Sequence, residues 1–111
     1  MITQETTDII LQFRDDRNWR QFHNPKDLAI SMNLEAAELL EVFLWSGTEL
    51  FCKEKLPQIA EELADVASYC VLLADACGLD LDQILRDKFR KNSEKYPVDK
   101  AYGSSKKYTE L

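Results

Sequence analysis

Residues 33–43 read Asn33-Leu34-Glu35-Ala36-Ala37-Glu38-Leu39-Leu40-Glu41-Val42-Phe43, and residues 61–66 read Glu61-Glu62-Leu63-Ala64-Asp65-Val66. Each stretch holds two acids three residues apart, among apolar residues: Glu35 with Glu38, and Glu62 with Asp65. Residues at this spacing share one face of an α-helix, so each predicted helix offers two carboxylates in one direction. If the helices pack side by side, four carboxylates meet, and their repulsion requires a compensating positive charge.

Basic residues are missing around both acid pairs. No Lys or Arg lies between Asp27 and Cys52, and none lies between Leu56 and Leu85. Salt bridges within the same helix are therefore not available, whereas a helix face that only meets water mixes both signs of charge. Clustered carboxylates without His or Cys suit Mg²⁺, or Mn²⁺. The pattern favours a metal site over the alternative, two amphipathic helices whose acids simply face water.

The composition predicts one globular domain over residues 1–111, with 45% hydrophobic and 31% charged residues. No apolar run reaches the roughly 18 residues that span a bilayer, and no cleavable signal is recognised, so we expect a cytoplasmic protein without membrane contact. A net charge of −6 argues against nucleic acid as a partner. Eight of the fourteen basic residues nevertheless fall between Arg86 and Lys107. The three cysteines fit buried free thiols, not a disulfide framework or a zinc site.

The expected fold class is all-α, because no stretch alternates as a strand does. We expect four helices, over about residues 3–19, 25–45, 57–77 and 80–96, followed by a polar, basic tail over 98–111. The clearest signals are the cap Asn24, followed by Pro25, and the stop at Gly78. Thr3 or Thr6 are alternative caps for the first helix, as Asp80 or Asp82 are for the fourth. Short connections imply antiparallel neighbours in a four-helix bundle.

The second helix is apolar on two sides. One stripe is Leu28, Met32, Ala36, Leu39 and Phe43; the other is Ile30, Leu34, Ala37 and Leu44. A helix that is apolar on two sides is buried on two sides. In a chain this small, the second stripe predicts contact with a partner subunit.

Aromatic residues gather in the turn before the second helix. Residues 18–23 contain Trp19, Phe22 and His23, which is the only histidine in the chain. These rings either close one end of the core, with His23 at the surface, or form a wall on which a nucleobase stacks. Tyr69, one turn beyond Asp65 on the same face, is either a core tyrosine or points at whatever the acids hold.

These parts together predict a nucleotide bound as its Mg²⁺ complex. A protein-bound Mg²⁺ keeps several waters and accepts substrate phosphates as ligands, and the basic C-terminal segment offers further phosphate contacts. The reaction that such a site performs most directly is phosphoanhydride hydrolysis, with a carboxylate as proton acceptor. A di-iron site is not favoured, because it needs Glu-x-x-His pairs and neither acid helix has a histidine.

The sequence resembles the MazG-like all-α nucleotide pyrophosphohydrolases, and among them the small dCTP-pyrophosphatase branch. The matching motifs are Glu-x-x-Glu at 35–38, Glu-x-x-Asp at 62–65, the stretch 17–25, Leu44-Trp45, Lys88-x-x-x-Asn92, Lys95-Tyr96-Pro97 and residues 106–111. The acid pairs alone are weakly specific, whereas the whole set in this order is strongly specific. The resemblance covers nearly the whole chain.

The resemblance implies Mg²⁺-dependent cleavage of a (deoxy)nucleoside triphosphate such as dCTP to the monophosphate and pyrophosphate, which clears non-canonical or surplus nucleotides. By this analogy the metal ligands are Glu35, Glu38, Glu62 and Asp65. Glu38 and Glu41 are the catalytic candidates, Glu41 as an extra ligand, a group behind the ligands or the general base. The base and sugar pocket would be shaped by Trp19, His23, Trp45 and Tyr69. The phosphates would be faced by Lys88, Asn92, Lys95 and Tyr96, from the same or a neighbouring subunit.

One position departs from that branch, which is expected to carry a histidine where this chain has Ile10. A base or sugar contact is therefore missing, and strict dCTP preference is not implied. Family members form homodimers or dimers of dimers, in agreement with the doubly apolar second helix. Two alternatives stay open: a non-catalytic helical dimer that binds nucleotide or a protein partner, and a structural bundle with solvated acids.

Overall fold

The structure is a computed structural model that describes residues 2–111, and the elements in this range are all helical. They are α1 (Gln4–Asp16), η1 (Trp19–Phe22), α2 (Pro25–Glu41), η2 (Lys53–Lys55), α3 (Leu56–Ala76), α4 (Leu81–Lys95), α5 (Val98–Ala101) and η3 (Tyr108–Glu110). The expected all-α class is confirmed, and α5 is a short fifth helix that we did not expect. The chain divides into two compact units, one ending at Gly78 and the other formed by Leu79–Leu111. The single domain over 1–111 stays a prediction.

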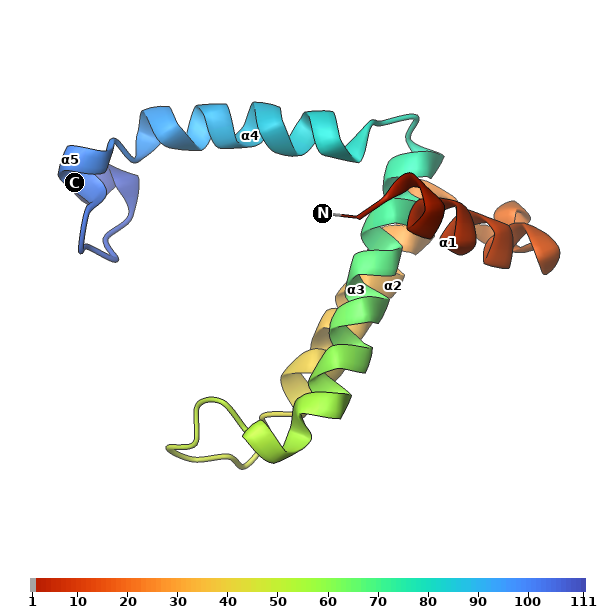
Figure 1. Cartoon of the computed structure of the whole chain (residues 1–111), viewed down its shortest axis with the longest axis horizontal. Coiled ribbons are helices and arrows are strands. Elements are labelled where there is room, and N and C mark those ends of the chain that lie inside the picture. The colour runs from red at the N-terminus through yellow and green to blue at the C-terminus, as the bar shows by residue number, and fades with distance from the viewer. Residues whose placement is uncertain (1) are drawn as a thin grey trace. The chain divides into compact units, whose positions relative to one another are not determined.

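The first unit is built on α2 and α3, which lie side by side (Figure 1). The two helices are antiparallel: Glu35 of α2 lies near Glu62 of α3, and further along α2 the carbonyl oxygen of Val42 accepts a hydrogen bond of 3.1 Å from Lys55 Nζ. The expected start signals are confirmed, since Asn24 caps α2 through the backbone N–H of Asp27. This hairpin therefore brings the two acid stretches together.

The buried core lies toward the start of α2 and the second half of α3. Its members are Leu28, Val71, Leu72 and Ala74, with Cys52 buried separately in the connection before α3. Helix α1 packs against α3, and its Arg14 is 4% exposed. Arg14 Nη1 donates to Asp75 Oδ2 at 2.6 Å, which ties α1 to the last part of α3.

Helix α2 is shorter than expected. We predicted that it would reach about Trp45, but it ends at Glu41 and continues as tight turns. The backbone N–H groups of Phe43 and Leu44 bond three residues back, and Trp45 has a positive φ of 63°. This change of conformation ends the helix four residues early and turns the chain toward α3.

The second unit starts with α4, whose cap is Asp80: its Oδ1 accepts the backbone N–H of Gln83. The tail contains α5 and η3, so it is more structured than the sequence suggested. The ring of Tyr108 packs edge-on against Tyr96, with centroids 5.9 Å apart, and Lys95 Nζ lies 4.9 Å from its centroid. These contacts bring the end of the tail back to the last turn of α4.

The predicted second stripe of α2 is exposed in this chain: Ile30 is 52%, Leu34 60% and Leu44 59% accessible. The exposure agrees with the partner subunit that we expect, and the oligomer stays a prediction. All three cysteines are free thiols, as expected, but Cys77 is exposed, so the expectation that all are buried is wrong. None of the helices within residues 2–111 is both long enough and apolar enough to cross a membrane.

Candidate functional site

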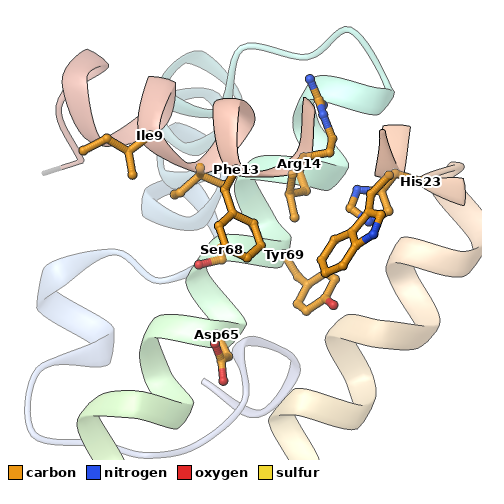
Figure 2. Close-up of a pocket in the computed structure, with 10 residues that line it drawn as sticks. Ile9, Phe13, Arg14, His23, Asp65, Ser68 and Tyr69 are labelled. Atoms are coloured by element: carbon orange, nitrogen blue, oxygen red, sulfur yellow. The ribbon is translucent and has the colours of Figure 1, made fainter. Parts of the chain in front are cut away.

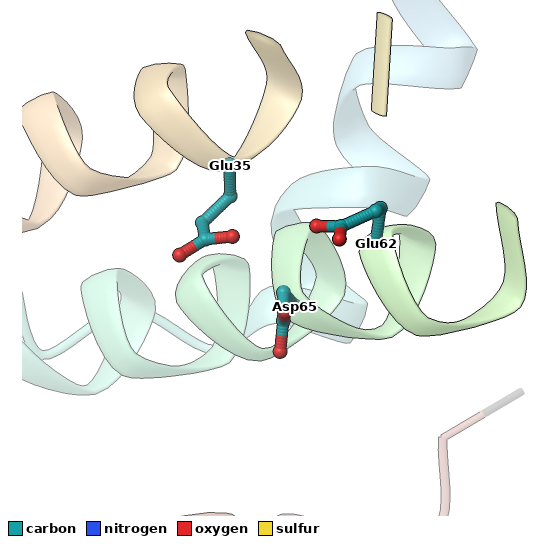
Figure 3. A group of neighbouring side chains, drawn as sticks. All are labelled: Glu35, Glu62 and Asp65. Carbon is teal, nitrogen blue, oxygen red and sulfur yellow. The ribbon is translucent and has the colours of Figure 1, made fainter. Parts of the chain in front are cut away.

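Three acids from the two antiparallel helices converge in the first unit. One carboxylate oxygen each from Glu35, Glu62 and Asp65 lies within 4.8 Å of the others. Figure 3 shows Glu35 reaching from α2 toward the two acids of α3. Because Glu62 and Asp65 are three residues apart on one helical face, a single partner helix can oppose both.

Two oxygens of this cluster have no partner. Glu35 Oε2 and Glu62 Oε2 are buried and accept no hydrogen bond, although buried polar atoms are almost always satisfied. Burial, followed by the negative charge of Glu38, raises the pKa of Glu35 above its ordinary value. Burial, together with the neighbouring carboxyl group of Glu38, likewise raises the pKa of Glu62. The site therefore favours either a retained proton or a bound cation over free negative charge.

The donor set fits a hard divalent cation. All the converging atoms are carboxylate oxygens, which suit Mg²⁺ or Mn²⁺ and not the softer metals that need His or Cys. The buried, unpartnered oxygens of Glu35 and Glu62 are suited to face such a cation. The part of the chain that the structure describes therefore contains a possible metal-binding cluster at the acids that the sequence singled out.

The fourth predicted ligand, Glu38, lies beside the three-acid group and not within it. It raises the pKa of both Glu35 and Glu62, so its carboxyl group is close to theirs. Glu38 and Glu41 also line a cavity of about 410 Å³ that reaches Glu62. Both catalytic candidates thus adjoin the cluster, and their roles stay predictions.

One basic residue that we did not anticipate lies next to these acids. Lys55 lines the same 410 Å³ cavity as Glu38, Glu41 and Glu62. The sequence analysis excluded salt bridges within each acid helix, but Lys55 immediately precedes α3 and faces the end of α2. The approach of Lys55 to the acids depends on the fold and was not expected from the sequence.

A second cavity, of about 330 Å³, lies between α1 and α3 (Figure 2). It is lined by Ile9, Ile10, Phe13, Arg14, Trp19, His23, Asp65, Ser68, Tyr69 and Leu72. Three of the four residues expected in a base pocket, Trp19, His23 and Tyr69, thus lie around one cavity together with Asp65 of the acid cluster. This volume and largely apolar lining are typical of small-molecule sites.

The fourth expected pocket residue, Trp45, is 93% exposed in the turn after α2. Its ring does not contribute to the core of this chain. The predicted contact between Trp45 and a nucleotide is therefore not formed by the 330 Å³ cavity, whose lining does not include it. A role for Trp45 in binding stays a prediction.

The ring of His23 lines the second cavity. Its Nδ1 is buried and has no partner. Burial, and secondarily the charge of Arg14, lowers the pKa of His23, which favours the neutral ring. Trp19 lies 6.4 Å from the His23 ring centroid and packs edge-on against Phe13, so the wall of this cavity is aromatic.

The contribution of α1 was only partly recognised from the sequence. Ile9, Ile10 and Phe13 are apolar residues of α1 that together form one wall of the second cavity. Ile10, the position that departs from the resembled branch, is among the lining residues. Part of this wall is exposed, since Ile9 is 63% and Phe13 50% accessible, and the sequence alone does not indicate this exposure.

The four residues expected at the phosphates lie in the second unit. Lys88 and Asn92 are four residues apart on α4, and Lys95 and Tyr96 form its end. Lys95 and Tyr96 both contact the ring of Tyr108. Their contact with a substrate stays a prediction.

Comparisons with known proteins agree on one family. A MazG-like family model matches residues 30–111. The chain is 37% identical to dCTP pyrophosphatase 1 of Mus musculus and 37% identical to that of Homo sapiens. Each match extends over 105 residues and covers 90% of this chain. The chain spans 62% of the length of each of these curated relatives. A pyrophosphatase of known structure from Archaeoglobus fulgidus is 39% identical, with a TM-score of 0.79 over 85% of this chain and 91% of that one.

Proposed function

The chain belongs to the MazG-like family, and on this premise we propose that it is a Mg²⁺-dependent nucleoside triphosphate pyrophosphohydrolase. It cleaves a (deoxy)nucleoside triphosphate such as dCTP to the monophosphate and pyrophosphate. The observation that carries this proposal is the convergence of Glu35, Glu62 and Asp65, with two buried oxygens left unpartnered. The names of the relatives, dCTP pyrophosphatase 1 and a pyrophosphatase, support the reaction class.

Glu35, Glu62 and Asp65 would hold the metal, and Glu38 would complete the ligand set from the adjoining turn of α2. A bound Mg²⁺ supplies neutralisation of the phosphate charge and a water of lowered pKa. Glu41, which is exposed beside Glu38, is free to act as the proton acceptor. Glu38 is the alternative acceptor when it is not bound to the metal.

The nucleobase occupies the cavity between α1 and α3. Trp19 and Tyr69 offer ring faces for stacking, and the His23 ring, which also lines this cavity, contacts a polar edge of the base. Ile9 and Ile10 make the opposite part of the lining apolar. The preferred base is therefore selected mainly by shape and stacking and by one hydrogen-bonding histidine, without strict restriction to dCTP.

The functional assembly is a homodimer or homotetramer. The exposed apolar stripe of Ile30, Leu34 and Leu44 supports an interface between subunits. The phosphates are contacted within this assembly by four residues at α4 and its end: Lys88, Asn92, Lys95 and Tyr96. Its role is to clear non-canonical or surplus nucleotides from the cytoplasmic pool.

The test is product analysis with a panel of NTPs and dNTPs, in the presence and absence of Mg²⁺. The expected result is monophosphate plus pyrophosphate, formed only with the metal, with rates that rank the bases. Release of inorganic phosphate instead would refute the assigned bond. Nucleotide binding by folded, metal-loaded protein without any product would favour the non-catalytic binding dimer.

A further inference from the structure

The acid cluster lies between two cavities. The cavity between α1 and α3 reaches the cluster at Asp65, whereas the 410 Å³ cavity reaches it at Glu62. The other lining residues of the 410 Å³ cavity are Glu38, Glu41, Val42, Lys55 and Gln58. A ligand held by the acids therefore has room on both sides of them.

One face of α3 connects the two cavities. It carries Gln58, Glu62, Asp65, Tyr69 and Leu72, at alternating spacings of four and three residues. Such residues lie above one another along a helix, and Glu62 and Tyr69 are about 10 Å apart along its axis. A ligand that uses both cavities would therefore lie along α3, with the acids near its middle.

Lys55 is the one basic side chain in the lining of the 410 Å³ cavity. Its Nζ donates to the carbonyl oxygen of Val42 at 3.1 Å, which fixes the ammonium group at the end of α2. Among the residues that the structure describes, no carboxylate lies within 4.0 Å of it as an ion-pair partner. An ammonium group has three donors, so two remain for a ligand.

The surroundings of Lys55 favour an anion only when the acids are neutralised. Lys55 is the N-cap residue of α3, where the helix dipole adds partial positive charge. Glu38, Glu41 and Glu62 on the same cavity oppose this field. A phosphate would therefore enter as a complex with a divalent cation and not as a free anion.

We propose that the cavity beside Lys55 binds the terminal phosphates of the substrate, and that Lys55 contacts them directly. The substrate then lies along α3, with its base at Tyr69 and its outer phosphates at Lys55. This inference rests on the proposed function and deepens it, because it assigns a direction to the bound nucleotide and a phosphate contact from the first unit. Lys55 lies in the first unit, whereas the other predicted phosphate contacts come from α4 in the second unit.

The test is equilibrium binding of inorganic pyrophosphate and of a nucleoside monophosphate, each with Mg²⁺. The monophosphate is the product of the nucleotide that the parent protein hydrolyses fastest. Lys55→Gln removes the charge, and Lys55→Arg keeps it. Lys53→Gln is the matched control, since Lys53 lies in the same short helix η2 but is not among the residues that line the cavity.

Lys55→Gln is expected to weaken pyrophosphate binding about tenfold, because it loses a charge-assisted hydrogen bond. The affinity for the monophosphate should equal that of the parent. The affinity for Mn²⁺, measured by electron paramagnetic resonance, should also be unchanged. Lys55→Arg should recover most of the pyrophosphate affinity, and Lys53→Gln should behave as the parent. Circular dichroism checks that the end of α2 survives loss of the bond to Val42.

Two results would overturn the inference. Unchanged pyrophosphate affinity in Lys55→Gln would remove Lys55 from the phosphate site. Equal weakening of pyrophosphate, monophosphate and Mn²⁺ would mean that Lys55 only supports the fold. Either result leaves hydrolysis by the parent intact, whereas a parent that releases no pyrophosphate from any nucleotide refutes the proposed function and this inference together.

Discussion

Arg14 Nη1 and Asp75 Oδ2 are 2.6 Å apart, in an ion pair that joins α1 to the last part of α3. The Arg14 side chain is only 5% exposed, and its Nε also donates to Asp15 Oδ1 at 2.8 Å. Figure 2 shows its guanidinium group directed away from Asp65, so the cavity wall receives only the stem of the side chain. This pair fixes the wall that α1 contributes to the cavity without occupying it.

Asp75→Ala is expected to destabilise the first unit by roughly 2–4 kcal/mol, because it leaves a buried guanidinium with one partner fewer. Arg14→Met should cost less, since Asp75 is 33% exposed and can be hydrated once its partner is lost. Urea unfolding measures both values.

Lys26→Gln is the control for this pair. The Lys26–Asp27 pair is exposed at 78% and 51%, so its loss should change stability by less than about 0.5 kcal/mol. An equally small effect of Asp75→Ala would contradict the role of the Arg14 pair in joining α1 to α3.

The metal-free protein should lose stability as the pH rises. The pKa values of Glu35 and Glu62 are raised in the folded chain by burial and by Glu38, so the folded state holds their protons more tightly than the unfolded state. This preference favours folding in acid and is lost as the pH rises from about 4.5, the ordinary glutamate value, through the raised values. Thermal unfolding in a chelator, across this range, measures the slope.

Glu35→Gln should be more stable than the parent without metal and less stable than the parent with Mg²⁺. Without metal at neutral pH, the variant should melt above the parent, since one buried negative charge is gone. With Mg²⁺ the parent should gain more, because the cation binds only its folded state. Glu54→Gln, at an exposed acid outside the cluster, serves as control. A parent whose melting temperature ignores both pH and Mg²⁺ would show that the cluster is merely solvated.

The resemblance to the dCTP-pyrophosphatase branch predicts that Trp45→Ala weakens nucleotide binding severalfold, without changing stability or metal affinity. The side chain is 93% exposed, so its truncation removes almost no buried area from this chain. Trp45→Phe should retain part of the effect, because it keeps an aromatic face. If the variant instead loses its oligomeric state, as measured by light scattering, Trp45 belongs to a subunit interface.

Ile10→His should change the ranking of the bases. Ile10 lines the cavity at the position where the dCTP-pyrophosphatase branch is expected to carry a histidine. An added hydrogen-bonding group should raise the kcat/KM for dCTP, relative to the other nucleotides, by about tenfold. Ile9→His places the same group on a neighbouring, 63% exposed position and should have a smaller effect. If the parent, Ile10→His and Ile9→His rank the nucleotides identically by kcat/KM, residue 10 has no role in base selection.

Local signals in the sequence were sufficient for most helix limits. Asn24, Pro25 and Gly78 act through their own backbone and side-chain bonds, so their effect can be recognised without the fold. The end of α2 differs because it coincides with a contact from another part of the chain. Lys55, thirteen residues from Val42, donates a hydrogen bond to the Val42 carbonyl oxygen. The tail was likewise underestimated, since its order accompanies the distant contact between Tyr96 and Tyr108.

In the site too, local spacing could be predicted from the sequence, whereas contacts that depend on the fold could not. The spacing of Glu62 and Asp65 indicated a shared helical face, and the structure brings Glu35 to them. Which acid of α2 lies nearest depends on how that helix is rotated against α3, so the position of Glu38 outside the three-acid group could not be deduced. Lys55 was missed because it is adjacent to the acids in space and not along their helices.

The central claim is that the carboxylate cluster holds the metal on which hydrolysis depends. The most direct measurement is pyrophosphate release by the parent, by Glu35→Gln and by Glu38→Gln during a Mg²⁺ titration, with helicity and oligomer size followed in the same samples. We predict saturable, metal-dependent release by the parent and none by either variant, at unchanged helicity and size. Equal release by Glu38→Gln alone would remove only Glu38 from the mechanism. Equal release by the parent and Glu35→Gln, or release by the parent in a chelator, would contradict the claim.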